Sequence, residues 1–339
     1  MSIRLLTRAF AGLSLCAAAL SASAAGPFSG LVVFGDSLSD SGNNAILLTA
    51  AFGGALPPVV VTGDGFYSQI PSAAGTYSNG MVWTQYLAQS LGVPLAPSVA
   101  GGSNYAFGGA QTGLNGSDVP GLPGFPYSLQ TQVGTYLGAT GNIADPNALY
   151  VVAGGGNDVR AALEAIAAGA NAEATAAATI TAYAGNMAGM VASLKLAGAQ
   201  HVLVLNTPNF GLTPLANAMG IAPLATSLSF AMDHALDVAL SGSGVMSFDM
   251  FSFMTGVVNA GAASGFSNWT NACAAAVNHC DVNTSLFWDG IHPTTLAHQQ
   301  LAAAVFATAV PEPGMAALFA VGLVVVALGR RRRAALQQG

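Results

Sequence analysis

A serine near the N-terminus and an Asp–His pair near the C-terminus could together perform nucleophilic catalysis. Ser37 follows the apolar run 31–34 in a Gly-Asp-Ser-Leu sequence, and Asp289 and His292 belong to an Asp-Gly-Ile-His sequence. A serine hydroxyl is a weak nucleophile until a neighbouring base takes its proton. A carboxylate three residues before a histidine can bond one ring nitrogen and leave the other for the serine. These residue types therefore predict acyl transfer, with Ser37 as the nucleophile and His292 as its base.

Each motif has a simpler interpretation when it is taken alone. Ser and Asp are common helix N-caps, which would account for Ser37 without catalysis. Asp289 could likewise cap the last helix, which Pro293 is predicted to open, and His292 could then be solvated. The catalytic interpretation requires that two segments about 250 residues apart meet in the fold.

An oxyanion that develops during acyl transfer needs fixed hydrogen-bond donors, and two further segments could supply them. One is the pair Gly108–Gly109, where the missing side chains let a backbone N–H approach a substrate closely. We prefer Gly109, the second glycine, although Gly108 also fits. The other is Asn157, which follows an apolar run and offers a side-chain amide; its alternative role is helix capping. With the N–H of Ser37 these make three donors, and one such donor typically lowers the barrier by about 2.7–4 kcal/mol.

Apolar runs alternate with longer helix-like stretches, and these elements must position the catalytic segments. The runs cover 31–34, 148–153 and 201–205, and the helix-like stretches cover 81–91, 129–137, 172–196, 222–240 and 294–309. Continuous apolar runs suit parallel strands that are covered on both faces, and functional groups gather at the carboxyl ends of such strands. We therefore predict a single-domain, three-layer α/β/α sandwich with a mainly parallel, flavodoxin-like sheet. The Gly- and Pro-rich stretches 53–75 and 113–126 are predicted to be loops, and 246–254 is interpreted as core.

In this order, the four segments resemble the conserved blocks of the SGNH/GDSL hydrolase family, which are named for Ser, Gly, Asn and His. The resemblance spans roughly residues 31–306 and is closest to the secreted lipase/esterase, lecithinase/haemolysin-like branch. It implies that no metal or organic cofactor is needed. The residues that it implies for catalysis are Ser37, Asp289 and His292, and those for the oxyanion hole are Ser37, Gly109 and Asn157.

The two ends of the chain carry targeting patterns. Residues 1–25 have an arginine-bearing start, an apolar middle and a small-residue exit, which indicates a secretory signal peptide; the alternative is a buried first helix. Residues 310–339 contain a Pro-Glu-Pro motif, the apolar run 315–328 and four arginines, and they resemble the PEP-CTERM sorting signal of Gram-negative bacteria. The run of 14 residues is short for a bilayer core of about 30 Å, although a simple membrane anchor is the alternative. We therefore place the hydrolase domain at residues 26–309.

The body between these ends is acidic. Of the 8 Lys and Arg residues only Arg160 and Lys195 lie in it, so its net charge is near −11. Such a surface repels phosphate backbones, which argues against nucleic-acid binding. Cys273 and Cys280 are an even pair in a protein expected to be exported, so we expect a structural disulfide; two free thiols are the alternative. The adjacent His279 does not complete a metal site with these two cysteines.

The sequence therefore predicts a secreted serine esterase or lipase that hydrolyses carboxylic esters through an acyl-enzyme on Ser37. Its expected partners are a lipid or small ester substrate and the export and exosortase-type sorting machinery, with transient membrane contact through 315–328. The expected location is the exterior, cell surface or matrix of a Gram-negative bacterium, after a possible stay in the inner membrane. The alternatives are a carbohydrate acetyl esterase acting on exopolysaccharide and a non-catalytic surface or matrix protein. Acyl-chain choice is expected to depend on loops 44–80 and 110–128.

Overall fold

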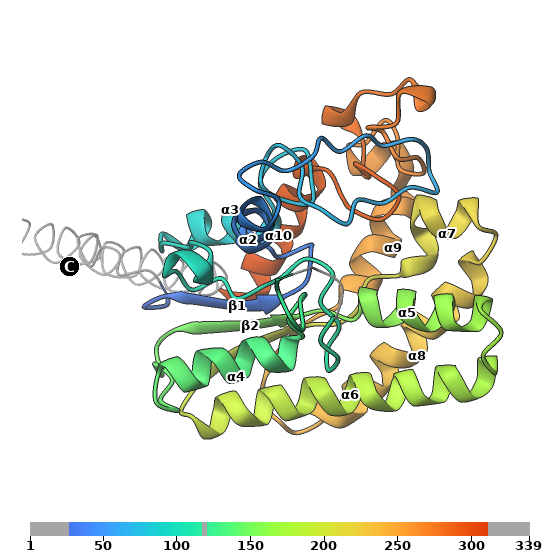
Figure 1. Ribbon diagram of the computed structural model, residues 1–339. Coiled ribbons are helices and arrows are strands. Elements are labelled where there is room, and N and C mark those ends of the chain that lie inside the picture. The colour runs from blue at the N-terminus through green and yellow to red at the C-terminus, as the bar shows by residue number, and fades with distance from the viewer. Residues whose placement is uncertain (1–26, 117–120, 311–339) are drawn as a thin grey trace, which may run out of the picture.

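A parallel sheet of four strands, in the order β1-β2-β3-β4, runs through the computed structural model, which describes residues 27–116 and 121–310 (Figure 1). The strands are β1 (Leu31–Gly35), β2 (Leu149–Ala153), β3 (His201–Leu205) and β4 (Met246–Phe248). The helices are α2 (Asn43–Ala51), α3 (Trp83–Leu91), α4 (Leu129–Ala139), α5 (Gly156–Ala167), α6 (Ala172–Leu196), α7 (Pro214–Ala218), α8 (Ala222–Leu240), α9 (Met250–Ala260) and α10 (Thr295–Ala309).

The outer edge of β1 is covered by an extended segment, residues 103–107. The Val33 N–H donates to the Ser103 carbonyl at 3.0 Å, and the Tyr105 N–H donates back to the Val33 carbonyl at 2.7 Å. A third bond joins the Phe107 N–H to the Gly35 carbonyl at 3.1 Å. This segment lies where a flavodoxin-like sheet has its outer strand, and the loop after it carries the glycine pair to the carboxyl end of β1.

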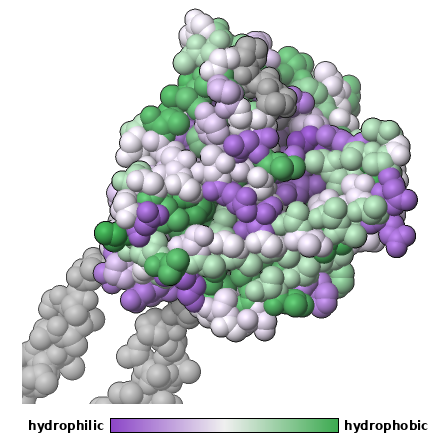
Figure 2. Space-filling view, turned by 60° about the horizontal axis from the view of Figure 1, so that its bottom comes forward, coloured by the Kyte–Doolittle hydropathy of each residue, from purple (hydrophilic) through white to green (hydrophobic). Residues whose placement is uncertain are grey.

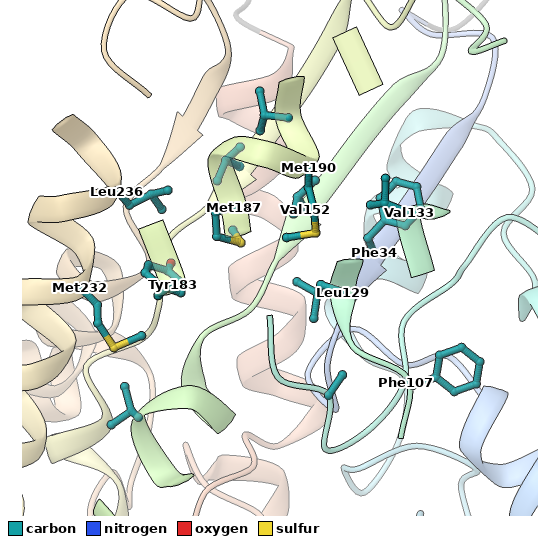
Figure 3. Close-up of a cluster of buried hydrophobic side chains, with 14 of the residues drawn as sticks. Phe34, Phe107, Leu129, Val133, Val152, Tyr183, Met187, Met190, Met232 and Leu236 are labelled. Atoms are coloured by element: carbon teal, nitrogen blue, oxygen red, sulfur yellow. The ribbon is translucent and has the colours of Figure 1, made fainter. Parts of the chain in front are cut away.

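Strand side chains alternate between two cores, one on each face of the sheet. Phe34 and Val152 point to the core beneath α4, α6 and α8, which Figure 3 shows in close-up. Val33 and Val151 point to the opposite core, which α3 and α10 cover. Each fully buried side chain of this size contributes roughly 1.5–3 kcal/mol to folding. The three predicted layers and the parallel sheet are therefore confirmed.

One sequence expectation about elements needs correction, and several elements were not predicted. The interpretation of 246–254 as core is supported, because Phe248, Met250 and Met254 are buried, but the edge strand β4 and the start of α9 in this stretch were not predicted. In β4 only Phe248 is buried, and three residues are too few for their alternation to mark a strand. Helix α5 was not predicted, since its start lies in a run of glycines with Gly155 at φ 120°. Pro293 does not open α10; it precedes the N-cap Thr294, whose hydroxyl accepts the Ala297 N–H at 3.3 Å.

The outer surface mixes apolar and polar residues rather than carrying dense charge. Figure 2 shows this interspersion on the face that comes forward when the bottom of Figure 1 is turned toward the viewer. Leu196 and Ile143 are 92% and 72% exposed. Among residues 27–116 and 121–310, no helix combines the length and apolarity needed to cross a bilayer.

A buried carboxyl on α8 predicts a pH-dependent stability. Asp233 accepts the Thr207 N–H at 2.9 Å through one oxygen. Its other oxygen, the Tyr183 hydroxyl and the Thr207 hydroxyl are buried without a hydrogen-bond partner among the described residues. Burial, with Asp249 and Asp237 nearby, raises the pKa of Asp233 to about 8 from 3.8, so the protonated form is favoured in the folded protein.

Stability from Asp233 is therefore fully present below about pH 4 and is lost as pH rises toward 8. In Asp233→Asn the amide oxygen still accepts the Thr207 N–H and cannot ionise. We expect the free energy of unfolding of the wild type to fall relative to this variant by roughly 3–5 kcal/mol between pH 4 and 9. Urea denaturation across that range measures the difference; parallel curves for the two proteins would contradict the assignment.

Candidate active site

The turn that carries Ser37 starts directly at the end of β1. The Asp36 carbonyl accepts the N–H groups of Ser39 and Asp40, both at 3.0 Å, and the Asp36 carboxylate accepts the Leu38 N–H at 3.0 Å. These bonds fold the chain back so that Ser37 stands at the sheet edge. Its side chain lines a cavity although the residue is only 7% exposed.

A second tight turn holds Asp289 and His292. One carboxylate oxygen of Asp289 accepts the backbone N–H groups of Ile291 at 2.9 Å and His292 at 2.8 Å. The other oxygen bonds Nδ1 of His292 at 2.8 Å and accepts the Ser68 N–H, also at 2.8 Å. The carboxylate is thus buried with four hydrogen bonds, and its position fixes the orientation of the imidazole ring.

The two turns meet, and the side chains form one hydrogen-bonded chain. Nε2 of His292 lies 3.0 Å from Oγ of Ser37, across 255 residues of sequence. The Tyr77 ring packs beside the imidazole, with ring centroids 5.2 Å apart. With Nδ1 bonded to the carboxylate, Nε2 is the nitrogen that can accept a proton from the serine. The structure therefore brings Ser37, His292 and Asp289 together in the order that the sequence predicted.

The glycine pair lies beside Ser37, and its two N–H groups differ. The Gly108 N–H donates to the Asp40 carboxylate at 3.1 Å. The Gly109 N–H has no hydrogen-bond acceptor among the described residues, and Gly109 has φ 84°, a conformation that glycine adopts readily. A side chain at position 108 would also collide with Tyr77, because a Cβ there would lie 2.1 Å from the ring. The free N–H therefore favours Gly109 over Gly108 as an oxyanion donor.

Asn157 lies in the first turn of α5 and lines the same cavity. Its Nδ2 donates to the Ala110 carbonyl at 3.0 Å, which leaves the second hydrogen of the amide for another acceptor. Nη2 of Arg160 lies 3.4 Å from the amide oxygen, which favours the same orientation of the amide. Asn157 is thus a donor beside the glycine pair rather than a helix cap, since Gly155 occupies the N-cap position.

Two further buried carboxyls flank the site. Burial raises the pKa of Asp36 to about 6, against the opposing effects of the Leu38 N–H and nearby His292. Burial also raises the pKa of Asp158 to about 6, although Thr112 donates to it through both its N–H and its hydroxyl. Among the described residues, no group of His, Cys, Asp or Glu is arranged to hold a metal ion.

A cavity of about 370 Å³ opens above Ser37. Its lining comes from both stretches that were expected to govern acyl-chain choice, 44–80 and 110–128. The first is not all loop as predicted, because residues up to Ala51 belong to α2. Its apolar walls include Leu48 and Phe125, and its polar lining includes Arg160. The volume falls within the usual range for small-molecule sites.

Several residues that shape the site were not assigned a role from the sequence. Asp40 makes four backbone contacts, with Gly42, Asn43, Asn44 and Gly108, which join the serine turn to the glycine pair. Its pKa is raised by burial to about 6. Tyr77 lines the cavity and packs beside the His292 ring. Ser68 contacts Asp289 through its backbone N–H, a contact that no side-chain motif could reveal.

Cys273 and Cys280 lie at disulfide-bonding distance, with 5.5 Å between their Cα atoms. The expected signal peptide, residues 1–25, lies outside the described residues, as does the sorting signal at 310–339 except for Val310. The pattern-based interpretation of both ends therefore stays a prediction.

The chain is similar to several known proteins. The family model described as GDSL-like Lipase/Acylhydrolase matches residues 31–305. Lipase 1 of Photorhabdus luminescens is 36% identical over 189 residues, which cover 55% of this chain and 23% of that protein. A GDSL esterase/lipase of Arabidopsis thaliana is 27% identical over 315 residues, covering 81% of this chain and 87% of that protein.

A crystal structure of the carbohydrate acetylesterase Est24 from Sinorhizobium meliloti superposes with a TM-score of 0.42. The two chains are 16% identical, and the superposition covers 82% of this chain and 96% of the other. A structural similarity this low does not indicate a shared function. The chain also spans less than a quarter of the length of Lipase 1.

Proposed function

The chain belongs to the GDSL-like Lipase/Acylhydrolase family of ester hydrolases, and from that membership we propose that it is a serine esterase or lipase acting on carboxylic esters. The observation that carries the proposal is the unbroken hydrogen-bonded chain from the Asp289 carboxylate through His292 to Oγ of Ser37. A fold that only binds ligands has no need of this arrangement, because it serves to remove a proton from an alcohol.

In the proposed first half-reaction, Oγ of Ser37 attacks the ester carbonyl carbon while Nε2 of His292 takes the hydroxyl proton. The carbonyl oxygen becomes an oxyanion, which accepts hydrogen bonds from the N–H groups of Ser37 and Gly109 and from the Asn157 amide. When the tetrahedral intermediate collapses, the C–O bond to the alcohol breaks and His292 gives that oxygen its proton. The acyl group then stays on Ser37 as an ester.

In the second half-reaction, water replaces the alcohol. His292 takes a proton from the water as it attacks the acyl-enzyme, and the same proton returns to Oγ of Ser37 when the acid leaves. Asp289 stays ionised throughout and stabilises the imidazolium that forms in each step. Every proton therefore moves among His292, Ser37, the substrate and the attacking water, and no metal or organic cofactor takes part in the proposal.

The proposed substrate is a lipid or another small ester, because the cavity has both apolar and polar walls beside Ser37. We expect the purified protein to hydrolyse p-nitrophenyl esters and a fluorophosphonate to label Ser37 alone. A profile from acetate to palmitate esters, with a phospholipid and an acetylated glycan, identifies the preferred class. If no ester is hydrolysed and the fluorophosphonate does not react, the proposed function is wrong.

We also propose that the protein is exported and sorted through its ends. The signal-peptide-like segment 1–25 and the PEP-CTERM-like segment 310–339 support this proposal through their residue order. The intact mass of the protein recovered from outside the producing cells tests it. A mass that still includes both segments would argue against processing by a signal peptidase and an exosortase-type enzyme.

A further inference from the structure

One segment outside the catalytic motifs, residues 64–68, contacts the turn that carries Asp289. The Ser68 N–H donates to Asp289 at 2.8 Å, on the same oxygen that bonds the His292 ring. Two residues earlier, the Phe66 carbonyl accepts the Gly290 N–H at 2.7 Å. The segment thus holds the Asp-Gly-Ile-His turn at two consecutive positions.

The fit between this segment and the turn is close. A Cβ at position 290 would lie 2.5 Å from the Phe66 carbonyl oxygen and 2.6 Å from the Asp64 carbonyl oxygen. Real Cβ contacts to backbone oxygen are longer, so only glycine fits at position 290 with the segment in place. A displacement of the segment would therefore change the position of the Asp289 carboxylate.

The same segment also contacts Arg160, which lies beside the proposed oxyanion donor Asn157. Nη1 of Arg160 donates to the Tyr67 hydroxyl at 3.1 Å, and its guanidinium lies over the Tyr67 ring, 5.3 Å from the centroid. Arg160 in turn lies 3.4 Å from the amide oxygen of Asn157. Residues 64–68 therefore contact both Asp289 and the side chain that supports Asn157.

Residues 53–75 contain neither helix nor strand. One local backbone bond, from the Phe66 N–H to the Gly63 carbonyl at 3.1 Å, bends the segment. The Asp64 side chain ties it to a distant part of the chain by accepting three hydrogen bonds. The donors are the Ala272 N–H at 2.7 Å, the Asn278 amide at 2.8 Å and the Asn271 amide at 3.0 Å. Asn278 lies within the loop between Cys273 and Cys280, which are at disulfide distance, and the other two donors directly precede it.

We propose that Asp64 is a positioning residue for Asp289. The Asp64 carboxylate binds residues 64–68 to residues 271–278. The segment held in this way donates a hydrogen bond from Ser68 to Asp289, and Asp289 orients His292. The proposal rests on the proposed function, since it concerns the rate of that reaction. Asp64 itself does not line the substrate cavity, although Tyr67 and Ser68 of the same segment do. Because the segment holds Asp289 directly, we expect removal of the Asp64 carboxylate to act mainly on kcat.

The test compares Asp64→Ala, Asp64→Asn and a matched control in full-length protein, with a p-nitrophenyl ester well below the unfolding temperature. We expect Asp64→Ala to lower kcat about tenfold or more (about 1.4 kcal/mol) with KM changed less than about twofold. Asp64→Asn keeps an oxygen that accepts the Ala272 N–H and the Asn278 amide, so we expect kcat within about threefold of the wild type.

The control is Asp281→Asn, which makes the same change of charge in the neighbouring loop. Asp281 is exposed, and among the residues that the structure describes its carboxylate bonds only to Asn283, within its own turn. We expect wild-type kcat and KM from this variant. A kcat for Asp64→Ala within twofold of the wild type would overturn the proposal, as would equal losses in Asp64→Ala and Asp281→Asn, or a loss that appears in KM alone.

A double-mutant cycle with Asn278→Ala tests the same contact by removing its donor. Because both changes break the hydrogen bond between Asp64 and Asn278, we expect the kcat of the double variant to be no lower than that of Asp64→Ala alone. Additive losses would overturn the proposal. If Asp64→Ala does not fold, Asn278→Ala decides: lower kcat with unchanged KM supports the proposal, and wild-type kinetics contradict it.

The proposed function and this inference fail in different ways. A wild-type protein that hydrolyses no ester contradicts the function itself. An active wild type that Ser37→Ala abolishes, combined with an Asp64→Ala variant of unchanged kcat, contradicts only the positioning role of Asp64.

Discussion

Replacing Ser37 with alanine is expected to lower kcat for a p-nitrophenyl ester by roughly 10⁶-fold. The alanine has no oxygen to attack the carbonyl, and His292 then has no alcohol within 3.0 Å of Nε2 to deprotonate. The remaining donors of the site would still bind the ester, so KM is expected to change much less than kcat. Steady-state kinetics and fluorophosphonate labelling measure the two effects, and labelling is expected to disappear.

The chain offers a matched control for this variant in the same turn. The Ser41 hydroxyl is buried without a hydrogen-bond partner among the described residues, so Ser41→Ala removes the same atom without breaking a bond. We expect wild-type kcat from Ser41→Ala. A Ser37→Ala protein that hydrolyses the ester at the wild-type rate would show that another residue is the nucleophile.

Replacing Asp289 with asparagine is expected to lower kcat by roughly 10⁴-fold. One oxygen of Asp289 accepts two backbone N–H groups, a role that an amide oxygen can keep. The other oxygen faces two donors, His292 Nδ1 and the Ser68 N–H, where an NH₂ group cannot accept. The imidazole is then pushed toward the tautomer that carries its proton on Nε2, and that nitrogen cannot take the proton of Ser37.

The control for this change of charge is Asp237→Asn, an exposed position on α8. Circular dichroism and thermal unfolding establish whether Asp289→Asn is folded at the assay temperature, since the Ser68 N–H loses its acceptor. A folded Asp289→Asn protein with kcat within tenfold of the wild type would mean that His292 is oriented by another group.

Local patterns in the sequence were sufficient for three of the four strands in the described residues, for the helices α3, α4, α6, α8 and α10, and for the chemistry-bearing residues. The runs at 31–34, 148–153 and 201–205 are buried on both faces, so their apolar character is continuous and marks β1, β2 and β3. The long helices α6 and α8 were predicted with the bounds that the structure has. By contrast, β4 has three residues and one buried side chain, which is too little pattern to mark a strand.

Residue types and spacing indicated that Ser37, Asp289 and His292 could perform acyl transfer, because a serine nucleophile needs a base and the base is oriented by a carboxylate. The order of the four segments, which resembles the SGNH/GDSL family, favoured this interpretation over helix capping. Only the tertiary structure decided that they meet, since a contact across 255 residues depends on how β1 and the turn before α10 pack at one sheet edge. The tertiary structure also favours Gly109 over Gly108 as an oxyanion donor, because Asp40 accepts the Gly108 N–H and the Gly109 N–H has no acceptor among the described residues. Ser68 and Phe66 contact the Asp-Gly-Ile-His turn through their own backbone atoms, which every residue has, so no sequence pattern could predict these contacts.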